Sequence, residues 1–227
     1  MTDPSPDTAA RPRILDLFCG AGGAAVGYHR AGFDVVGVDI EAQPHYPFEF
    51  HQLDALEFLS INDAYQMSQN FDAIHASPPC QAYSTATRER DRHPDLVDPT
   101  RRLLQATGLP WVMENVPTAP LTWGITLCGG MFGMQIRRHR FFECSFMVLQ
   151  LPHDCPSEPW EVTGHAGGHN RQSQSHRKYR DTEHAKELMG MPWCATSREV
   201  TEAIPPKYAE FIGHQLLRHL AKSEATA

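Results

Sequence analysis

The hydrophobic positions of the first 40 residues change period in a regular order. A short apolar run of strand length covers 14–18, a glycine-rich turn follows at 20–23, and 24–31 has helical composition. A second run, rich in β-branched residues, covers 33–40 and ends next to an acid, Asp39. Strand, turn, helix and strand in this order predict a βαβ unit with two parallel strands.

Later segments extend this pattern. The runs 71–76 and 110–117 predict two further strands, and the second is bounded by prolines at each end. A helix is predicted after the two prolines at 205–206, because the following residues place apolar side chains on one face at helical spacing: Tyr208, Phe211, Ile212, Leu216 and Leu220. Strands that alternate with helices predict an α/β fold, with a mainly parallel sheet covered by helices on both faces.

Composition divides the chain into a main domain and an insert. Residues 145–186 are rich in His, Gly, Ser, Gln and Arg and show no sustained hydrophobic period. We therefore expect one domain from 13–144 plus 187–222, a small insert at 145–186, and tails at 1–12 and 223–227. The N-terminal tail has no apolar core of a signal peptide and is expected to be disordered.

Charge and cysteine usage narrow the function classes. The 227 residues are 41% hydrophobic with no apolar run near the roughly 20 residues of a membrane span. The formal net charge of −7 argues against a protein that coats nucleic acid without specificity, although basic stretches at 137–140 and 169–180 offer local patches. On charge alone, a solvated basic face is the favoured interpretation of either stretch. The six cysteines form no CxxC pair, which predicts free thiols in a reducing cytoplasm.

The insert and the residue before it also contain possible zinc ligands. They are Cys144, His153, Cys155, His165 and His169. Their spacing matches no common zinc motif, so we predict no metal.

The glycine turn has the features of a nucleotide site. Gly20 and Gly22 allow a tight turn and a close approach of the backbone to a ligand, beside the free N–H groups of a helix N-terminus. Asp39 lies 19 residues after Gly20, at the end of the next predicted strand, where a carboxylate can accept ribose hydroxyls. The pattern favours a nucleotide-type ligand and leaves a dinucleotide open.

Cys80 follows two prolines at the end of a predicted strand, in the sequence "SPPCQ". The prolines restrict the backbone and aim the next side chain into the expected ligand crevice. A free cysteine is more often a small buried hydrophobe. Polar neighbours on both sides favour a nucleophile here.

Glu114 occupies a similar position after the apolar "WVM". A nearly buried carboxylate holds a proton readily, although a paired structural acid would fit as well. Cys80 and Glu114 at neighbouring strand ends would form a nucleophile and acid pair for chemistry on an electrophilic ring or carbonyl.

Five motifs, in order, resemble those of the DNA (cytosine-5)-methyltransferases: "DLFCGAGG", "SPPCQ", "ENV", "RRHRFF" and "AIPPKYAEFIG". The resemblance covers most of 13–220. It implies a Rossmann-like S-adenosylmethionine-dependent methyltransferase sheet, with 145–186 as a small target-recognition region. Asp39 stands where the family more often has glutamate, and Thr201-Glu202 stands where it usually has Gly-Asn.

The resemblance also implies roles for single residues. It assigns S-adenosylmethionine binding to Phe18, Gly20, Gly22, Asp39, Ile40, Asp54, Pro78, Glu202 and Ala203. It assigns catalysis to Cys80, Glu114, Arg138 and Arg140. Contacts to nucleic acid are expected from Gln81, Ser84, Asn115, Arg171, Arg177, Lys178 and Arg180. The arginine motif also fits a register through Gln135 and Arg137, but the aromatic residues after Arg140 continue a strand and favour Arg138 and Arg140.

The implied function is methylation of C5 of a cytosine flipped out of double-stranded DNA, by a cytoplasmic monomer, without a membrane partner. An RNA cytosine methyltransferase remains a rival, since some relatives act on tRNA. A cofactor-binding or DNA-binding protein with a degenerate site is a third reading, against which the intact Cys80 and Glu114 speak.

Overall fold

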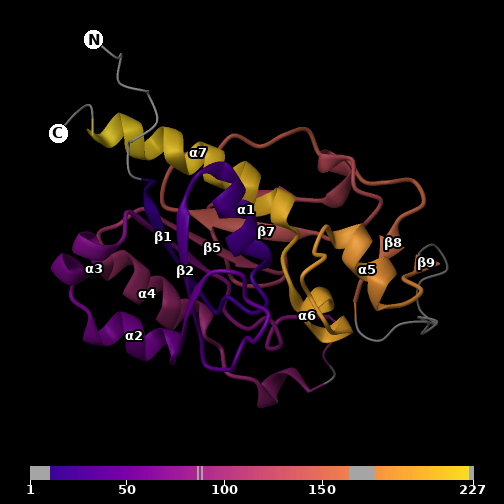
Figure 1. The fold of residues 1–227 in the computed structure, drawn as a ribbon, viewed down its shortest axis with the longest axis horizontal. Helices are drawn as coiled ribbons and strands as arrows, with labels where there is room; N and C mark the ends of the chain where they lie inside the picture. Colours follow the sequence, from indigo (N-terminus) through magenta and orange to yellow (C-terminus); the bar gives the residue numbers. More distant parts are fainter. Residues whose placement is uncertain (1–10, 86, 88, 164–176, 225–227) are drawn as a thin grey trace, which may run out of the picture.

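A seven-stranded sheet runs through the middle of the protein in the computed structural model (Figure 1). The structure describes residues 11–85, 87, 89–163 and 177–224. In space the strands follow the order β3-β2-β1-β4-β5-β7-β6. Their bounds are Arg13–Leu17 (β1), Asp34–Asp39 (β2), Glu49–Gln52 (β3), Ala73–Ala76 (β4), Trp111–Asn115 (β5), Gly124–Leu127 (β6) and Arg140–Cys144 (β7).

The strand directions confirm the prediction of a mainly parallel sheet. β3, β2, β1, β4 and β5 all run parallel to their neighbours, whereas β7 is antiparallel to both β5 and β6. The chain starts at β1, winds outward to β3 and then crosses to β4 on the other side. The order therefore reverses between β1 and β4, which is where open α/β sheets bind ligands, at the carboxyl ends of the strands.

The central strands are apolar on both sides because both faces of the sheet are covered. Ile14 of β1 belongs to one hydrophobic cluster, whereas Leu15 and Leu17 belong to the other, and all three are fully buried. Three helices supply buried side chains to the second cluster and cover that face (Figure 1): α2 (Ala55–Ile61), α3 (Ala64–Asn70) and α4 (Val97–Thr107).

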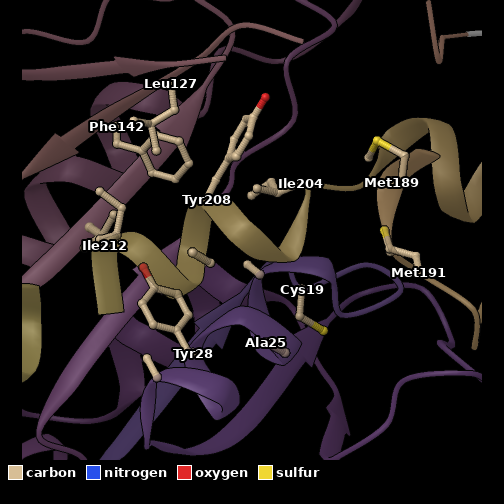
Figure 2. Close-up of a cluster of buried hydrophobic side chains, with 14 of the residues drawn as sticks. Cys19, Ala25, Tyr28, Leu127, Phe142, Met189, Met191, Ile204, Tyr208 and Ile212 are labelled. Atoms are coloured by element: carbon tan, nitrogen blue, oxygen red, sulfur yellow. The ribbon is translucent and has the colours of Figure 1, made fainter. Parts of the chain in front are cut away.

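Two helices cover the opposite face: α1 (Gly23–Ala31) and α7 (Pro206–Glu224), which pack against each other. Figure 2 shows their side chains gathered with Phe142 of β7, namely Ala25 and Tyr28 from α1 with Tyr208 and Ile212 from α7. The predicted terminal helix is confirmed, and it buries its apolar face against the sheet as its helical spacing indicates.

The described residues of the insert share the core of the main domain. Phe146, Val162 and Tyr179 are buried in the same cluster as α1 and α7. Its short strands β8 (Trp160–Glu161) and β9 (Arg177–Lys178) pair in parallel. The remaining elements are η1 (Arg90–Arg92), η2 (Gly129–Phe132), α5 (Thr182–Met189) and α6 (Ser197–Glu202). Helix α5 crosses the expected boundary at 186/187, because the Asp181 carboxylate accepts the His184 N–H and begins the helix earlier.

The expected tails fall mostly outside the described part of the chain. Residues 1–10 and 225–227 are not described, 11–12 lead into β1, and 223–224 are the last residues of α7. Among the described residues, no helix combines the length and the apolar character needed to cross a lipid bilayer.

Candidate active site

The turn after β1 folds tightly through three residues with left-handed backbone angles. Phe18 has φ +57°, Gly20 +49° and Gly22 +83°. Only glycine adopts this region without strain, so the two glycines explain how the chain reverses into α1. The Gly20 N–H donates to Oδ2 of Asp39 (2.9 Å), and the Glu41 N–H donates to Oδ1 (2.9 Å). Asp39 thus links the carboxyl ends of β1 and β2.

The surroundings of this turn fit an adenosine-bearing cofactor. A Cβ atom added to Gly20 would meet nothing within 4 Å, so the turn faces open space. Ile40, directly after Asp39, is 64% exposed and offers an apolar surface on which an adenine ring can lie. Asp54 begins α2, where its Oδ1 accepts the N–H groups of Leu56 (2.8 Å) and Glu57 (2.9 Å). These residues lie at or just after the ends of β2 and β3, beside the turn.

The segment before α7 lies against the start of α1. A Cβ atom added to Gly23 would lie 2.2 Å from the Ile204 carbonyl oxygen and 3.2 Å from the Ala203 Cβ. Ala203 is therefore next to the glycine turn, as its expected role requires. The exposed Glu202 side chain instead pairs with Arg198 (3.1 Å) on the surface of α6.

The loop that carries Cys80 is held from both sides. The Ser77 hydroxyl donates to the Phe18 carbonyl (3.2 Å), and Nδ2 of Asn115 donates to the buried Pro78 carbonyl (2.8 Å). The Ser84 N–H donates to the Cys80 carbonyl (2.8 Å) and closes a turn behind the cysteine. Asn115, expected to contact nucleic acid, thus also fixes the loop. The two prolines and these bonds give the Cys80 side chain a defined position at the end of β4.

Cys80, Glu114 and Arg140 come together at the carboxyl ends of β4 and β5. Oε1 of the buried Glu114 lies 3.0 Å from Nε of Arg140. Burial raises the pKa of Glu114, while the charges of Arg140 and then Arg138 lower it. Burial also raises the pKa of the Cys80 thiol, which Arg140 lowers and Glu114 raises. The Cys80 thiol, the Glu114 carboxyl group and the Arg140 guanidinium therefore lie close enough to shift one another's protonation.

Arg138 lies in a different environment from Arg140. Its side chain is buried, and its guanidinium donates to three carbonyls, those of Val162 (2.8 Å), Thr201 (2.8 Å) and Ala203 (2.7 Å). These bonds join the insert and the segment before α7 to the start of β7. By its contacts Arg138 is a positioning residue, and a direct catalytic role for it stays a prediction.

The residues expected to contact nucleic acid lie in two groups. Gln81 and Ser84, both partly buried, flank the Cys80 turn. In the insert, Arg177 forms an ion pair with Glu158, the Lys178 ammonium donates to the Thr163 carbonyl, and Arg180 is exposed. Arg171 and most of the basic stretch 169–180 lie outside the described residues. Their role in binding stays a prediction.

Two residues of the site were not expected from the sequence. Nε1 of Trp193 donates to the Ala21 carbonyl (2.8 Å) and braces the glycine turn from the segment after α5. Asp16 is fully buried in β1, and burial, together with the charge of Asp39, raises its pKa to about 8 despite a hydrogen bond from Tyr46. The available signal for Asp16 was an acid in the middle of the apolar run "ILDLF".

The possible zinc ligands named from the sequence do not all lie together in the fold. His153 and Cys155 lie together, close to Cys128 and His139, two residues that the sequence did not indicate as ligands. Cys144 lies at the far end of β7, and His165 and His169 lie outside the described residues.

Comparison with known families gives a match over the first half of the chain. Residues 12–119 match the family model described as C-5 cytosine-specific DNA methylase. The match spans β1 to β5 and includes Cys80 and Glu114.

Curated relatives are type II methyltransferases of bacteria. M.HgiGI of Herpetosiphon aurantiacus is 29% identical over 119 residues, which are 48% of this chain and 94% of that protein. M1.HphI of Haemophilus parahaemolyticus is 33% identical over 82 residues, which are 32% of this chain and 22% of that protein. M.HgiDI, also of H. aurantiacus, is 29% identical over 38% of its length. The chain thus spans well under half the length of some of these relatives.

Solved structures share the fold over nearly the whole chain. A prophage-encoded protein of Escherichia coli has a TM-score of 0.62 at 17% identity, covering 93% of this chain and 99% of that chain. The Dnmt2 methyltransferase of Schizosaccharomyces pombe has a TM-score of 0.62 at 14% identity, covering 92% and 99%. At these identities the likeness shows the fold alone.

Proposed function

We propose that this chain, whose residues 12–119 match the C-5 cytosine-specific DNA methylase family, belongs to that family and transfers a methyl group to C5 of cytosine in double-stranded DNA. S-adenosylmethionine is the cofactor of this family. The type II names of the curated relatives favour a role as the modification enzyme of a restriction-modification system. The free thiols of all six cysteines suit our proposal of a cytoplasmic enzyme, and we propose a monomer.

The observation that carries this proposal is the grouping of Cys80, Glu114 and Arg140. Cytosine C5 is a weak nucleophile until a group adds at C6. A thiolate is the strongest nucleophile among ordinary side chains. Burial raises the pKa of the Cys80 thiol, and the guanidinium of Arg140 opposes that rise by favouring the thiolate. Because burial raises the pKa of Glu114, this carboxyl group can hold the proton that the ring nitrogen N3 needs.

The reaction can be written with each bond and proton placed. The Cys80 thiol gives its proton to solvent water, and its sulfur forms a bond to C6 while Glu114 gives a proton to N3. The electrons of the C5–C6 double bond shift, and the ring becomes an enamine with nucleophilic C5. After C5 has gained the methyl group, a water molecule takes the C5 proton and the C5–C6 double bond forms again. The bond from sulfur to C6 breaks to leave the Cys80 thiolate, and N3 returns its proton to Glu114. We propose that Arg140, which lies 3.0 Å from Glu114, contacts the O2 side of the base and holds the carboxyl group in line.

The cofactor, when bound, supplies an electrophilic methyl group. We propose that Asp39 accepts its ribose hydroxyls and that Ile40 lies against its adenine. Both oxygens of Asp39 already accept one backbone N–H each, which leaves further lone pairs for the hydroxyls. The open face of Gly20 and the neighbouring Ala203 would line the rest of the site.

The target base must leave the DNA stack to reach a thiol in this position, at a cost of a few kcal/mol. We propose that Gln81 and Ser84, beside the cysteine, contact the flipped nucleotide. The exposed Arg180, with Arg177 and Lys178, is proposed to meet the phosphates from the insert.

The test compares Cys80→Ser with Cys144→Ala, a second thiol that lies at the far end of β7. We expect Cys80→Ser to lose methyl transfer to duplex DNA by at least about three orders of magnitude while keeping cofactor affinity, because it removes the nucleophile. Cys144→Ala is expected to stay active. Methylation is measured with labelled cofactor on genomic DNA, and bisulfite sequencing then gives the base and its context.

A duplex carrying 5-fluorocytosine separates the mechanism from the activity. Fluorine cannot leave as a proton does, so the wild-type chain should be trapped in a covalent adduct at Cys80, seen by peptide mass spectrometry. Methylation without a trapped adduct would refute the role of Cys80. Methylation of tRNA but not of DNA would instead establish the RNA enzyme that the motifs leave open.

A further inference from the structure

Two cysteines and two histidines converge at the junction between the insert and the end of the sheet. They are Cys128, His139, His153 and Cys155, and one ligand atom from each lies within 4.8 Å of all the others. The His139 and His153 rings are nearly parallel, with 17° between their planes. All four lie outside the proposed methyl-transfer site, and nothing in the proposed reaction uses them.

We propose that these four side chains bind one zinc ion in a closed tetrahedral site. With Zn–S near 2.3 Å and Zn–N near 2.0–2.1 Å, a tetrahedron has edges of about 3.8 Å between sulfurs, 3.4 Å between nitrogens and 3.6 Å between sulfur and nitrogen. The two Sγ atoms are 3.6 Å apart and the two Nε2 atoms 3.3 Å apart. Sγ of Cys155 lies 3.4 Å from Nε2 of His139 and 3.1 Å from Nε2 of His153. Each measured edge is thus within about 0.5 Å of the edge that zinc requires.

The pairing of the strands explains how residues far apart in the sequence meet. In the antiparallel pair of β6 and β7, Leu127 lies opposite Arg140. Continuing this register by one residue places Cys128 opposite His139, so the end of the hairpin supplies two ligands. The insert supplies the other two from one short segment, as His153 and Cys155 are separated by a single residue.

A tight backbone contact holds the two halves of the site together. A Cβ atom added to Gly130 would lie 2.6 Å from the Asp154 carbonyl oxygen, so only glycine permits the loop after Cys128 to approach the insert this closely. This contact brings Cys128, which directly precedes η2, against the ligands of the insert.

The donor set favours zinc over other biological metals. Two thiolates and two imidazoles suit zinc, whereas magnesium and calcium prefer oxygen. Four protein ligands leave no open position for a substrate, which is typical of a structural ion. Binding releases the two thiol protons, so the site is neutral with the ion in place.

The ion would fix the insert to the start of β7, the strand that carries Arg140. His139 directly precedes Arg140, and Nη1 of Arg140 donates to the His139 carbonyl (2.9 Å). This structural role rests on the proposed function, whereas the binding of zinc does not. A chain that binds zinc and methylates nothing would leave the metal site standing and refute the enzyme.

The first experiment measures metal in the full chain, purified without chelators under reducing conditions and supplied with zinc. We expect about one zinc per chain by mass spectrometry, and X-ray absorption should show two sulfurs at about 2.3 Å and two nitrogens at about 2.0–2.1 Å. Less than about 0.2 zinc per chain, or a shell without sulfur, would overturn the site. A disulfide between Cys128 and Cys155 in the same preparation would overturn it as well.

The second experiment uses variants and a spectroscopic metal. Cys155→Ser and His139→Ala should lower the zinc content at least about fivefold, whereas Cys144→Ala, at the far end of β7, should keep it. Zinc retained at the wild-type level in Cys155→Ser would overturn the assignment. Cobalt added to the metal-free wild-type chain should give the thiolate charge-transfer band and intense visible bands of a tetrahedral site. This readout holds even where a variant fails to fold, and its absence would also count against the site.

Discussion

The buried Asp16 should make the stability of this protein fall as the pH rises. Its carboxyl group is fully buried, its Oδ2 accepts one long hydrogen bond from Tyr46 (3.4 Å), and its Oδ1 has no hydrogen-bond partner among the described residues. Burial raises its pKa from 3.8 to about 8 in the folded chain. Between these values the folded state holds one proton more than the unfolded state.

The size of the effect follows from proton linkage. A folded state that binds one extra proton loses about 1.4 kcal/mol of unfolding free energy per pH unit, and this loss runs from near pH 4 up to the folded pKa. The stabilising proton is fully present in acid and lost toward alkaline pH. Asp16→Asn carries no such proton. From about pH 5 to 7 the wild type should therefore lose roughly 3 kcal/mol relative to the variant.

The assay is urea unfolding of both proteins at about pH 5, 6 and 7, followed by tryptophan fluorescence. The amide of the variant adds a constant offset, so the slope of the difference against pH is the quantity compared. Asp91→Asn, which removes an exposed acid from η1, serves as the matched control and should run parallel to the wild type. Parallel curves for wild type and Asp16→Asn would refute a raised pKa at this position.

Three further predictions concern the supports of the site. Gly23→Ala should unfold at least about 4–8 °C lower in a thermal melt, because its Cβ atom would lie 2.2 Å from the Ile204 carbonyl and such overpacking costs roughly 2 kcal/mol; an unchanged melting temperature would contradict this packing. Asn115→Ala should lower kcat more than it lowers cofactor affinity. It should also cost about 1–3 kcal/mol of unfolding free energy in urea, since the Pro78 carbonyl loses its hydrogen bond. Equal losses of kcat and of cofactor affinity would argue against a positioning role. Glu143→Gln should destabilise the chain at neutral pH and progressively less as the pH falls through the acid range. Burial raises the pKa of Glu143, but hydrogen bonds from Arg101 and from the Thr122 N–H, with the charge of Arg101, outweigh it and lower that pKa below its usual value. Chemical denaturation at neutral and acid pH checks this, and a pH-independent difference would contradict it.

Local patterns predicted the elements that position the cofactor turn. The change from strand period to glycine turn to helix specified β1, α1 and β2 within one or two residues, because these elements are consecutive and their signals lie within the segment itself. The same holds for α7, whose apolar face is continuous. The sequence Pro-Pro-Cys predicted that Cys80 follows the end of a strand, because this signal also lies within the segment itself.

The contacts between distant segments could not be predicted in this way. Cys128 and His139 meet because of the register in which β6 and β7 pair, and the spacing of residues in the sequence does not predict that register. Likewise Arg138 and Arg140 look equivalent in the motif. In the fold Arg138 donates to backbone carbonyls, whereas Arg140 pairs with Glu114. The sequence shows Asp16 only as an acid inside an apolar run, and its full burial follows from the helices that cover both faces of the sheet.

The core that the insert shares with the main domain limits how the insert can be exchanged. Phe146, Val162 and Tyr179 pack with the helices of the main domain, so these parts of the insert cannot be exchanged without changing the core. A graft from a relative that replaced these three side chains would open the centre of the enzyme as well as change its surface. The phosphate contacts that we propose for the insert should therefore be altered more readily by substitutions at exposed positions such as Arg180 than by exchange of the whole insert.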